Sequence, residues 1–142
     1  MSAIEDCTGF LGTWTLLPAS CVHEQGDPPR EGQYRIMRQG KNLRFDTSWT
    51  DATGERHEIS FEARPNGVAM PFDGGGLADA LSVTLVSERQ LDSTAWLNGK
   101  PVMHARRTLS DSGRQMTISQ TVNLPDGTSP TNWSTYERVS GP

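Results

Sequence analysis

Along most of this chain, apolar and polar residues alternate with a period of two. The segment from Leu43 to Thr50 has the sequence Leu-Arg-Phe-Asp-Thr-Ser-Trp-Thr, in which every second residue is apolar or a threonine. This alternation is typical of a β-strand with one buried face, because successive side chains of a strand point to opposite sides. The pattern predicts strands at Phe10–Leu17, Gln33–Gln39, Leu43–Thr50, Arg56–Ala63, Ala80–Ser87, Gln90–Leu97, Val102–Ser110, Gln115–Leu124 and Pro130–Val139.

Short turns separate the strands of the second half. Glycines at positions 99, 113 and 127 lie fourteen residues apart, within Asn98-Gly99, Asp111-Ser112-Gly113 and Pro125-Asp126-Gly127. Asn and Asp tolerate a left-handed backbone, and glycine adopts it without a Cβ clash, so the chain can reverse within a few residues at such sites. The spacing therefore predicts consecutive antiparallel hairpins, which form a β-meander.

Three segments interrupt the alternation. A capping-box pattern at the start of the chain predicts a single helical turn over Ser2–Cys7. Pro18 is expected to end the first strand, because proline cannot donate a hydrogen bond within a sheet, and we expect a proline-rich loop over Ala19–Gly32. The glycine-rich segment Arg64–Ala80 is too long for a hairpin connection, so we expect a second long loop there.

A meander of about nine strands leaves two exposed edges unless it closes on itself. Closure removes the rows of unpaired backbone groups that invite aggregation. Strands of this length also suit the tilted strands of a barrel. We therefore predict an all-β fold, a closed up-and-down antiparallel barrel of about 8–10 strands. We expect it to form a single domain that spans residues 1–142.

Composition excludes several classes of function. The chain has 142 residues, a net charge of −4 and an apolar content of 34%. Its charges are interspersed, which argues against nucleic acid as a partner, because phosphate binding needs clustered Lys and Arg. No apolar segment approaches the ~20 residues that span a bilayer, and the N-terminus lacks the features of a secretion signal. We expect a cytoplasmic protein with no membrane span.

The two cysteines, Cys7 and Cys21, have no C-x-x-C spacing. No histidine lies close enough in sequence to complete a zinc site with them. We expect two free thiols, with a disulfide between them as the alternative.

The two ends of the chain carry motifs of a known superfamily. Phe10-Leu11-Gly12-Thr13-Trp14 resembles the opening strand of the calycins, the superfamily of lipocalins and fatty-acid-binding proteins. Tyr136-Glu137-Arg138-Val139 is similar to the closing strand of fatty-acid-binding proteins. The resemblance implies a lipocalin-like barrel that holds an apolar ligand. It also implies that Trp14 closes one end of the barrel and that Arg138 lies across its indole.

Two features depart from fatty-acid-binding proteins. Those proteins place a two-helix lid after the first strand, whereas the loop Ala19–Gly32 is rich in proline. They also hold the fatty-acid carboxylate with an arginine two residues before the tyrosine of the last strand, and the corresponding residue here is Ser134. The first departure implies that the portal of the barrel is covered differently, and the second argues against a fatty acid as the ligand.

Turn lengths predict which polar residues face the interior, because a shift of one residue exchanges the two faces of a strand. A four-residue loop at 111–114 places Leu109 opposite Met116 and Arg107 opposite Ile118. A three-residue loop at 125–127 then places Met116 opposite Tyr136. In this register the outer face holds His104 and Arg106, and the interior holds Arg107, Gln120, Asn132, Ser134 and Tyr136. A turn that is one residue different would exchange the two sets.

Arg107 is the main candidate for ligand binding. An inward arginine in a cavity of low dielectric constant costs several kcal/mol unless an anion or hydrogen-bond acceptors meet it. A carboxylate or phenolate of a ligand would supply the anion. The structural alternative is an arginine satisfied by backbone carbonyls, Glu137 or Gln120.

Apolar residues of the other strands are candidates for a ligand-binding wall. Because a hollow and a filled barrel share the same period of two, alternation alone does not separate the wall from ordinary core packing. The candidates for this wall include Phe45, Trp49, Phe61 and Leu85.

Motifs of catalysis are missing from the sequence. It has no Gly-x-Ser-x-Gly, no His-Glu-x-x-His, no phosphate-binding loop and no dinucleotide-binding fingerprint. The three histidines are spread over a loop and two strands, and His57 is expected at the surface. We assign no catalytic residues and expect neither a metal nor a cofactor.

Three functions agree with this pattern. The first is a cytoplasmic protein that binds a small apolar or amphipathic molecule, with Arg107 and Tyr136 orienting its polar end. The second is an isomerase, cyclase or lyase that uses Tyr136 with Arg107, or with an inward His104, as acid and base. The third is a filled barrel that acts through its surface, for example as a homodimer. A hollow interior would favour the first two.

Overall fold

Ten antiparallel strands of one sheet dominate the structure, a computed structural model that describes residues 4–73 and 76–140. A short 3-10 helix, η1 (Glu5–Phe10), precedes them. The strands are β1 (Gly12–His23), β2 (Glu31–Gln39), β3 (Asn42–Thr50), β4 (Arg56–Ala63), β5 (Met70–Pro71), β6 (Ala80–Ser87), β7 (Gln90–Leu97), β8 (Lys100–Leu109), β9 (Gln115–Val122) and β10 (Thr131–Ser140).

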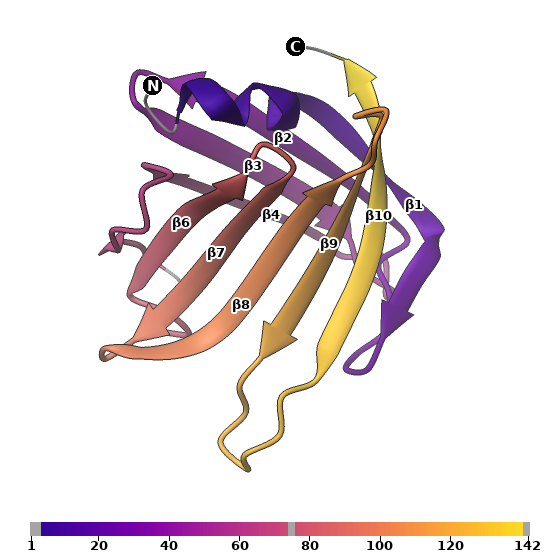
Figure 1. The fold of residues 1–142 in the computed structure, drawn as a ribbon. Helices are drawn as coiled ribbons and strands as arrows, with labels where there is room; N and C mark the ends of the chain where they lie inside the picture. The colour runs from indigo at the N-terminus through magenta and orange to yellow at the C-terminus, as the bar shows by residue number, and fades with distance from the viewer. Residues whose placement is uncertain (1–3, 74–75, 141–142) are drawn as a thin grey trace.

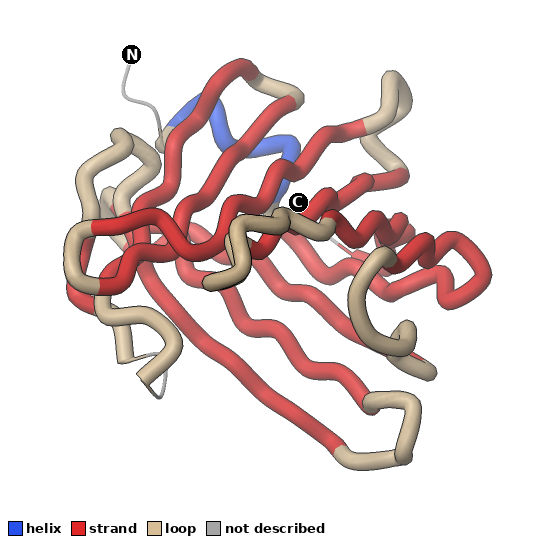
Figure 2. The backbone as a smooth tube through the Cα atoms, turned by 90° about the horizontal axis from the view of Figure 1, so that it is seen from below, coloured by secondary structure: helices blue, strands red, loops and turns tan. Residues whose placement is uncertain are grey.

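The sheet wraps around until its first and last strands meet. Its strand order is β4-β3-β2-β1-β10-β9-β8-β7-β6-β5. Strand β1 therefore pairs with β10, and every other pair in this order joins two strands that are consecutive in the sequence. Figure 1 shows η1 lying across the upper end of the resulting barrel, and Figure 2 shows the strands joined by loops at both ends. The predicted all-β, up-and-down meander is confirmed, and the barrel is nearly closed.

The barrel remains open between β4 and β6, where the ladder has no strand pair among the described residues. The loop after β4 partly fills this gap. Gly67 N donates to Val83 O of β6 (2.8 Å), and the short β5 pairs with the start of β6. Phe72 contacts Phe61 of β4 edge to face, with ring centroids 6.0 Å apart. Aromatic packing therefore bridges the opening between β4 and β6, where no backbone hydrogen bonds pair the described residues of the two strands.

The first strand is longer than predicted. We expected Pro18 to end it, but β1 continues to His23 because its pairing with β10 shifts register between Leu17 and Val22. Pro18 falls in this unpaired stretch, where its missing N–H costs no ladder bond. Ser20 Oγ donates to Leu17 O (2.5 Å) and accepts from Thr135 N (2.8 Å), which holds the bulge against β10. The first loop is correspondingly shorter than the predicted Ala19–Gly32.

The N-terminal helix also differs from its prediction. It runs over Glu5–Phe10 and not over Ser2–Cys7, and no side chain caps its first turn. Ser2, the expected capping residue, lies outside the described residues. No helix within the described residues has the length and apolarity of a membrane span.

The turns and the register of the second half match the sequence prediction. Asn98 and Gly99 both have positive φ (52° and 78°), as do Gly113 and Gly127. Met116 lies opposite Leu109 on one side and opposite Tyr136 on the other. Local turn chemistry therefore sets the pairing of β8, β9 and β10.

One end of the barrel is packed solid around Trp14. The indole is completely buried, and its Nε1 donates to Phe10 O (3.0 Å). The Arg138 guanidinium lies over the ring, with Cζ 4.2 Å from the ring centroid, as the motif implied. The same guanidinium donates to the carbonyls of Leu11, Gly9 and Gly113. This pair therefore joins η1, the start of β1, the end of β10 and the β8–β9 turn.

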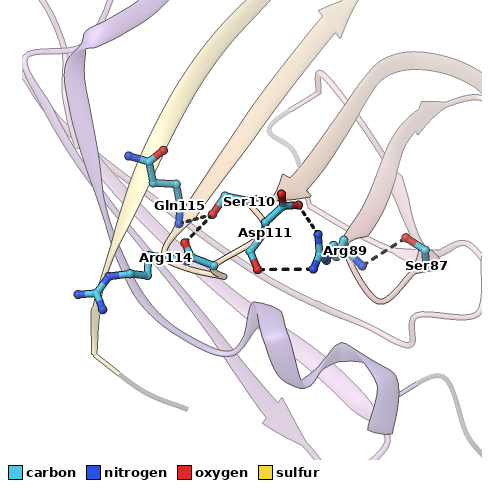
Figure 3. Close-up of polar contacts among 7 residues, drawn as sticks. Ser87, Arg89, Ser110, Asp111, Arg114 and Gln115 are labelled. Atoms are coloured by element: carbon cyan, nitrogen blue, oxygen red, sulfur yellow. Dashed lines mark hydrogen bonds and ion pairs between the residues drawn. The ribbon is translucent and has the colours of Figure 1, made fainter.

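Polar contacts tie the two hairpin turns together at this closed end. Arg89, between β6 and β7, forms an ion pair with Asp111 of the β8–β9 turn (Figure 3). Ser110 Oγ accepts from Gln115 N (3.1 Å) and so closes the second turn on itself. Both charged side chains are exposed, so we assign the ion pair little stability.

No disulfide joins the two cysteines, so both are thiols, as predicted. Cys7 is completely buried, and this burial, with a smaller effect from the charge of Asp6, raises its pKa to about 11. Cys21 is only partly buried, and burial raises the pKa of its thiol as well.

We expect the two thiols to differ in reactivity, because the thiolate is the reacting species and Cys7 is shielded from reagent. In native protein at pH 8, a disulfide-exchange reagent such as DTNB should modify Cys21 first and Cys7 at least tenfold more slowly. Both should react at similar rates in guanidinium chloride. In Cys21→Ser the fast phase should vanish; a fast phase that persists in this variant would place Cys7 at the surface.

Candidate functional site

The interior of the barrel is hollow. A cavity of about 380 Å³ begins beyond the packed end and reaches the opposite end of the barrel. Strand β8 runs along the cavity. Its residue Leu109 belongs to the packed core, and the next inward residues along the strand, Arg107, Ala105 and Met103, border the cavity. This volume falls within the ~300–1,000 Å³ of small-molecule sites. It also contradicts the filled-barrel interpretation.

Arg107 lies at the floor of this cavity and is only 3% exposed. Its Nε and Nη2 both donate to Tyr34 Oη (3.0 and 2.6 Å), and its Nη1 donates to Ser93 Oγ (3.0 Å). Its guanidinium also lies over the Phe45 ring, 5.0 Å from the centroid. These contacts hold the guanidinium in one orientation.

No carboxylate forms an ion pair with Arg107 within the part of the chain that the structure describes. Its hydrogen-bond partners are the hydroxyl groups of Tyr34 and Ser93. Neither Gln120 nor Glu137, the partners named in the structural alternative, bonds to it. This buried positive charge therefore borders the cavity without a carboxylate counter-charge among the described residues.

Tyr136 provides a second polar group at the same depth. The side chain is 8% exposed and borders the cavity, and its hydroxyl forms no hydrogen bond with any described residue. Burial, with smaller effects from Tyr34 and Cys21, raises the pKa of Tyr136 above its usual range, although Arg107 opposes the shift. The group therefore stays a neutral O–H donor. Its ring contacts Tyr34 edge to face, with centroids 5.7 Å apart.

Tyr34 is, with Ser93, a partner of Arg107 that sequence reasoning missed. It lies on β2 and borders the cavity, and its Oη accepts both bonds from Arg107. An oxygen that accepts twice still has one hydrogen to donate, and this hydrogen has no acceptor in the described chain. The signal was present in the sequence, because Tyr34 alternates with Ile36 on the buried face of the predicted strand Gln33–Gln39.

The other predicted polar residues lie nearer the mouth. Gln120 borders the cavity but is exposed, and its Nε2 donates to Met103 Sδ (2.7 Å). Asn132 also borders the cavity, yet its side chain is engaged with the two residues that follow β1. Its Oδ1 accepts from Glu24 N (2.9 Å) and Gln25 N (3.1 Å), and its Nδ2 donates to Gln25 O (3.0 Å). Asn132 therefore positions the rim of the cavity.

The four predicted wall residues divide into two groups. Trp49 and Phe61 border the cavity. Phe45 lies beneath them, completely buried and stacked on Phe61 with centroids 4.5 Å apart. Leu85 is partly buried and packs against the core without bordering the cavity. The apolar wall is therefore built from β3 and β4, next to the gap.

Among the described residues, no hydrogen bond joins the side chains named as the acid–base pair of the enzyme interpretation. His104 is exposed on the outer face of β8, as predicted by the register, with Nε2 3.7 Å from Asp92 Oδ2. Arg107 donates its hydrogen bonds to Tyr34 and Ser93, not to Tyr136.

Comparisons with known proteins show the fold of the barrel. No protein-family model matches this chain, and a comparison with curated proteins gave no significant match. Among solved structures, the zebrafish ileal bile acid-binding protein complexed with cholic acid superimposes with a TM-score of 0.54 at 13% identity, covering 92% of this chain and 99% of that one. Apocrustacyanin C1 gives a TM-score of 0.50 at 8% identity, covering 99% and 72%. The chain has the lipocalin-like barrel fold of the calycins.

Proposed function

We propose that this protein binds a small apolar or amphipathic molecule inside its barrel, with a carboxylate or phenolate end at Arg107. The observation that carries the proposal is the buried guanidinium at the floor of a cavity, without a carboxylate partner among the described residues. A ligand anion would provide the missing counter-charge, and the Tyr136 hydroxyl would donate a further hydrogen bond. The apolar part of the ligand would then lie along Trp49 and Phe61.

The fold comparison agrees with this proposal. The zebrafish protein named above is complexed with cholic acid. We infer binding in the barrel from the cavity of the present chain and not from that ligand, because the two sequences share only 13% identity.

We further propose a cytoplasmic setting and one domain over residues 1–142. Two cysteines that form no disulfide are usual in a reducing compartment, where disulfides are rare. All ten strands belong to one sheet. Neither inference is needed for ligand binding.

Native mass spectrometry of freshly purified protein tests the proposal directly. We expect a mass in excess of the chain that disappears on denaturation and identifies the chemical class of the ligand. Protein stripped of this molecule should bind N-phenyl-1-naphthylamine, an apolar fluorescent probe, at one saturable site.

Ala105→Phe provides the matched control, because Ala105 borders the cavity and a phenyl group there occupies its volume. This variant should keep the circular dichroism spectrum of the wild type and lose both the co-purified mass and the probe. If wild type shows neither an added mass nor saturable probe binding, or if Ala105→Phe binds the probe as wild type does, the interior is not the binding site.

A further inference from the structure

A second cluster of polar side chains lies at the rim of the cavity, on the turn between β3 and β4 and at the start of β4. Asp51, Glu55 and His57 each offer one ligand atom there, and these three atoms lie within 4.8 Å of one another. Asp51 also borders the cavity. The cluster combines two carboxylates with an imidazole, and the Arg107 site does not use it.

The turn itself holds the Asp51 carboxylate in place. Its Oδ1 accepts from Thr53 N (2.9 Å), Thr53 Oγ1 (2.6 Å) and Glu55 N (2.9 Å). The second oxygen, Oδ2, is thereby directed at His57 Nε2, 2.8 Å away. The hydrogen bonds from Thr53 first, and then from His57, hold the pKa of this carboxyl below its usual range, so it is ionised at neutral pH.

The His57 imidazole is held by ring stacking as well as by its hydrogen bond to Asp51. Trp49 and His57 are directly opposite each other on β3 and β4, and their rings stack with centroids 5.2 Å apart and planes 20° from parallel. The stacking fixes the plane of the imidazole while Nε2 points to Asp51. One ligand atom from the turn after β3 and one from β4 are thus positioned before any ion arrives, which lowers the entropy lost on coordination.

The spacing suits a small divalent transition ion. Ligands at ~2.1 Å from Zn²⁺, separated by 90–110°, lie about 3.0–3.4 Å apart, so a shift of a few tenths of an ångström would separate Nε2 and Oδ2 enough to admit the ion. One imidazole nitrogen with two carboxylates is a donor set for Zn²⁺ and similar ions, whereas Ca²⁺ and Mg²⁺ prefer oxygen ligands alone. Glu55 is exposed and can swing toward the ion.

We propose that Asp51, Glu55 and His57 form a site for a divalent transition-metal ion of the Zn²⁺ type at the rim of the cavity. The ion replaces the hydrogen bond between Asp51 and His57, with the imidazole neutral and its remaining proton on Nδ1. Three protein ligands leave at least one coordination position for water or for a donor atom of a molecule in the barrel. The site does not depend on Arg107 or on the proposed function.

Calorimetric titration of tag-free, chelator-treated protein with Zn²⁺ tests this site. We expect one saturable site in the wild type, at least tenfold weaker binding in His57→Ala and severalfold weaker binding in Glu55→Gln. His104→Ala is the matched control, because His104 also lies on the surface near a carboxylate, that of Asp92. It should bind Zn²⁺ within about twofold of the wild type.

A histidine-selective ¹H–¹⁵N NMR spectrum adds a readout of the ligand atom itself. Zn²⁺ should move the Nε2 resonance of His57 and leave those of His23 and His104 in place. Glu55→Gln keeps the test decisive if His57→Ala fails to fold, because Glu55 is exposed. No saturable binding by the wild type, or equal affinities of His57→Ala and His104→Ala, would overturn the proposal.

Discussion

Replacement of Trp14 by alanine should lower the free energy of unfolding by about 3–5 kcal/mol, the usual cost of truncating a large buried aromatic side chain. The indole is completely buried at the packed end of the barrel. Its removal leaves a void, deprives Phe10 O of its donor and leaves the Arg138 guanidinium without its aromatic partner. Urea denaturation followed by far-ultraviolet circular dichroism measures the change.

Trp133→Ala is the matched control for this experiment. Trp133 has the same side chain but lies on the outer face of β10, where it is 42% exposed. Its truncation should cost less than about 1 kcal/mol, because little buried surface is lost. If Trp14→Ala does not fold, Trp14→Phe should still fold with an intermediate loss. Equal losses in the two alanine variants would contradict the role of Trp14 as the residue that closes the barrel.

The parts of the fold that the sequence predicts are those that depend on local chemistry. Asn98-Gly99 and the turns around Gly113 and Gly127 adopt positive φ, and these positions determine how many residues separate each pair of strands. The register of β8, β9 and β10 follows, and with it the inward positions of Arg107 and Tyr136. The alternation of apolar and polar residues with a period of two predicted the strands themselves.

The parts that were missed depend on contacts between distant segments. The bulge that carries β1 past Pro18 is held by Ser20 against Thr135, 115 residues away. The gap between β4 and β6 likewise reflects the path of the loop that follows β4, which has no regular pattern.

The same distinction applies to the candidate site. Alternation predicts that Arg107 faces the interior of the barrel. It does not predict the partner of Arg107, because Tyr34 lies on β2, 73 residues away in the sequence. The pairing of Asp51 with His57 needs the turn geometry of residues 51–55. Whether the interior is hollow could not be predicted at all, because cavity walls and core packing share one pattern. Three-dimensional packing decides between them.

Replacement of Arg107 by methionine should weaken the binding of an anionic probe by about 10–150-fold, and should leave the binding of a matched neutral probe within about threefold. The expected loss corresponds to ~1.5–3 kcal/mol for hydrogen bonds between a charged donor and a ligand anion. 1-Anilinonaphthalene-8-sulfonate carries a sulfonate, and N-phenyl-1-naphthylamine has the same ring system without it. Fluorescence titration of stripped protein gives both dissociation constants.

Methionine is the substitution of choice because its flexible, unbranched side chain keeps contact with Phe45 while the charge is removed. Arg106→Met serves as the control, since Arg106 is the neighbouring residue on the outer face of β8. Its Nε lies 3.5 Å from Asp92 Oδ1. It should bind both probes as the wild type does. Two results would contradict the anchoring role of Arg107: unchanged affinity for the sulfonate, or an equal loss for both probes. An equal loss for both probes would show that the guanidinium acts by supporting Tyr34 and Ser93. Only a direct contact with the anion distinguishes two ligands that differ by one charged group.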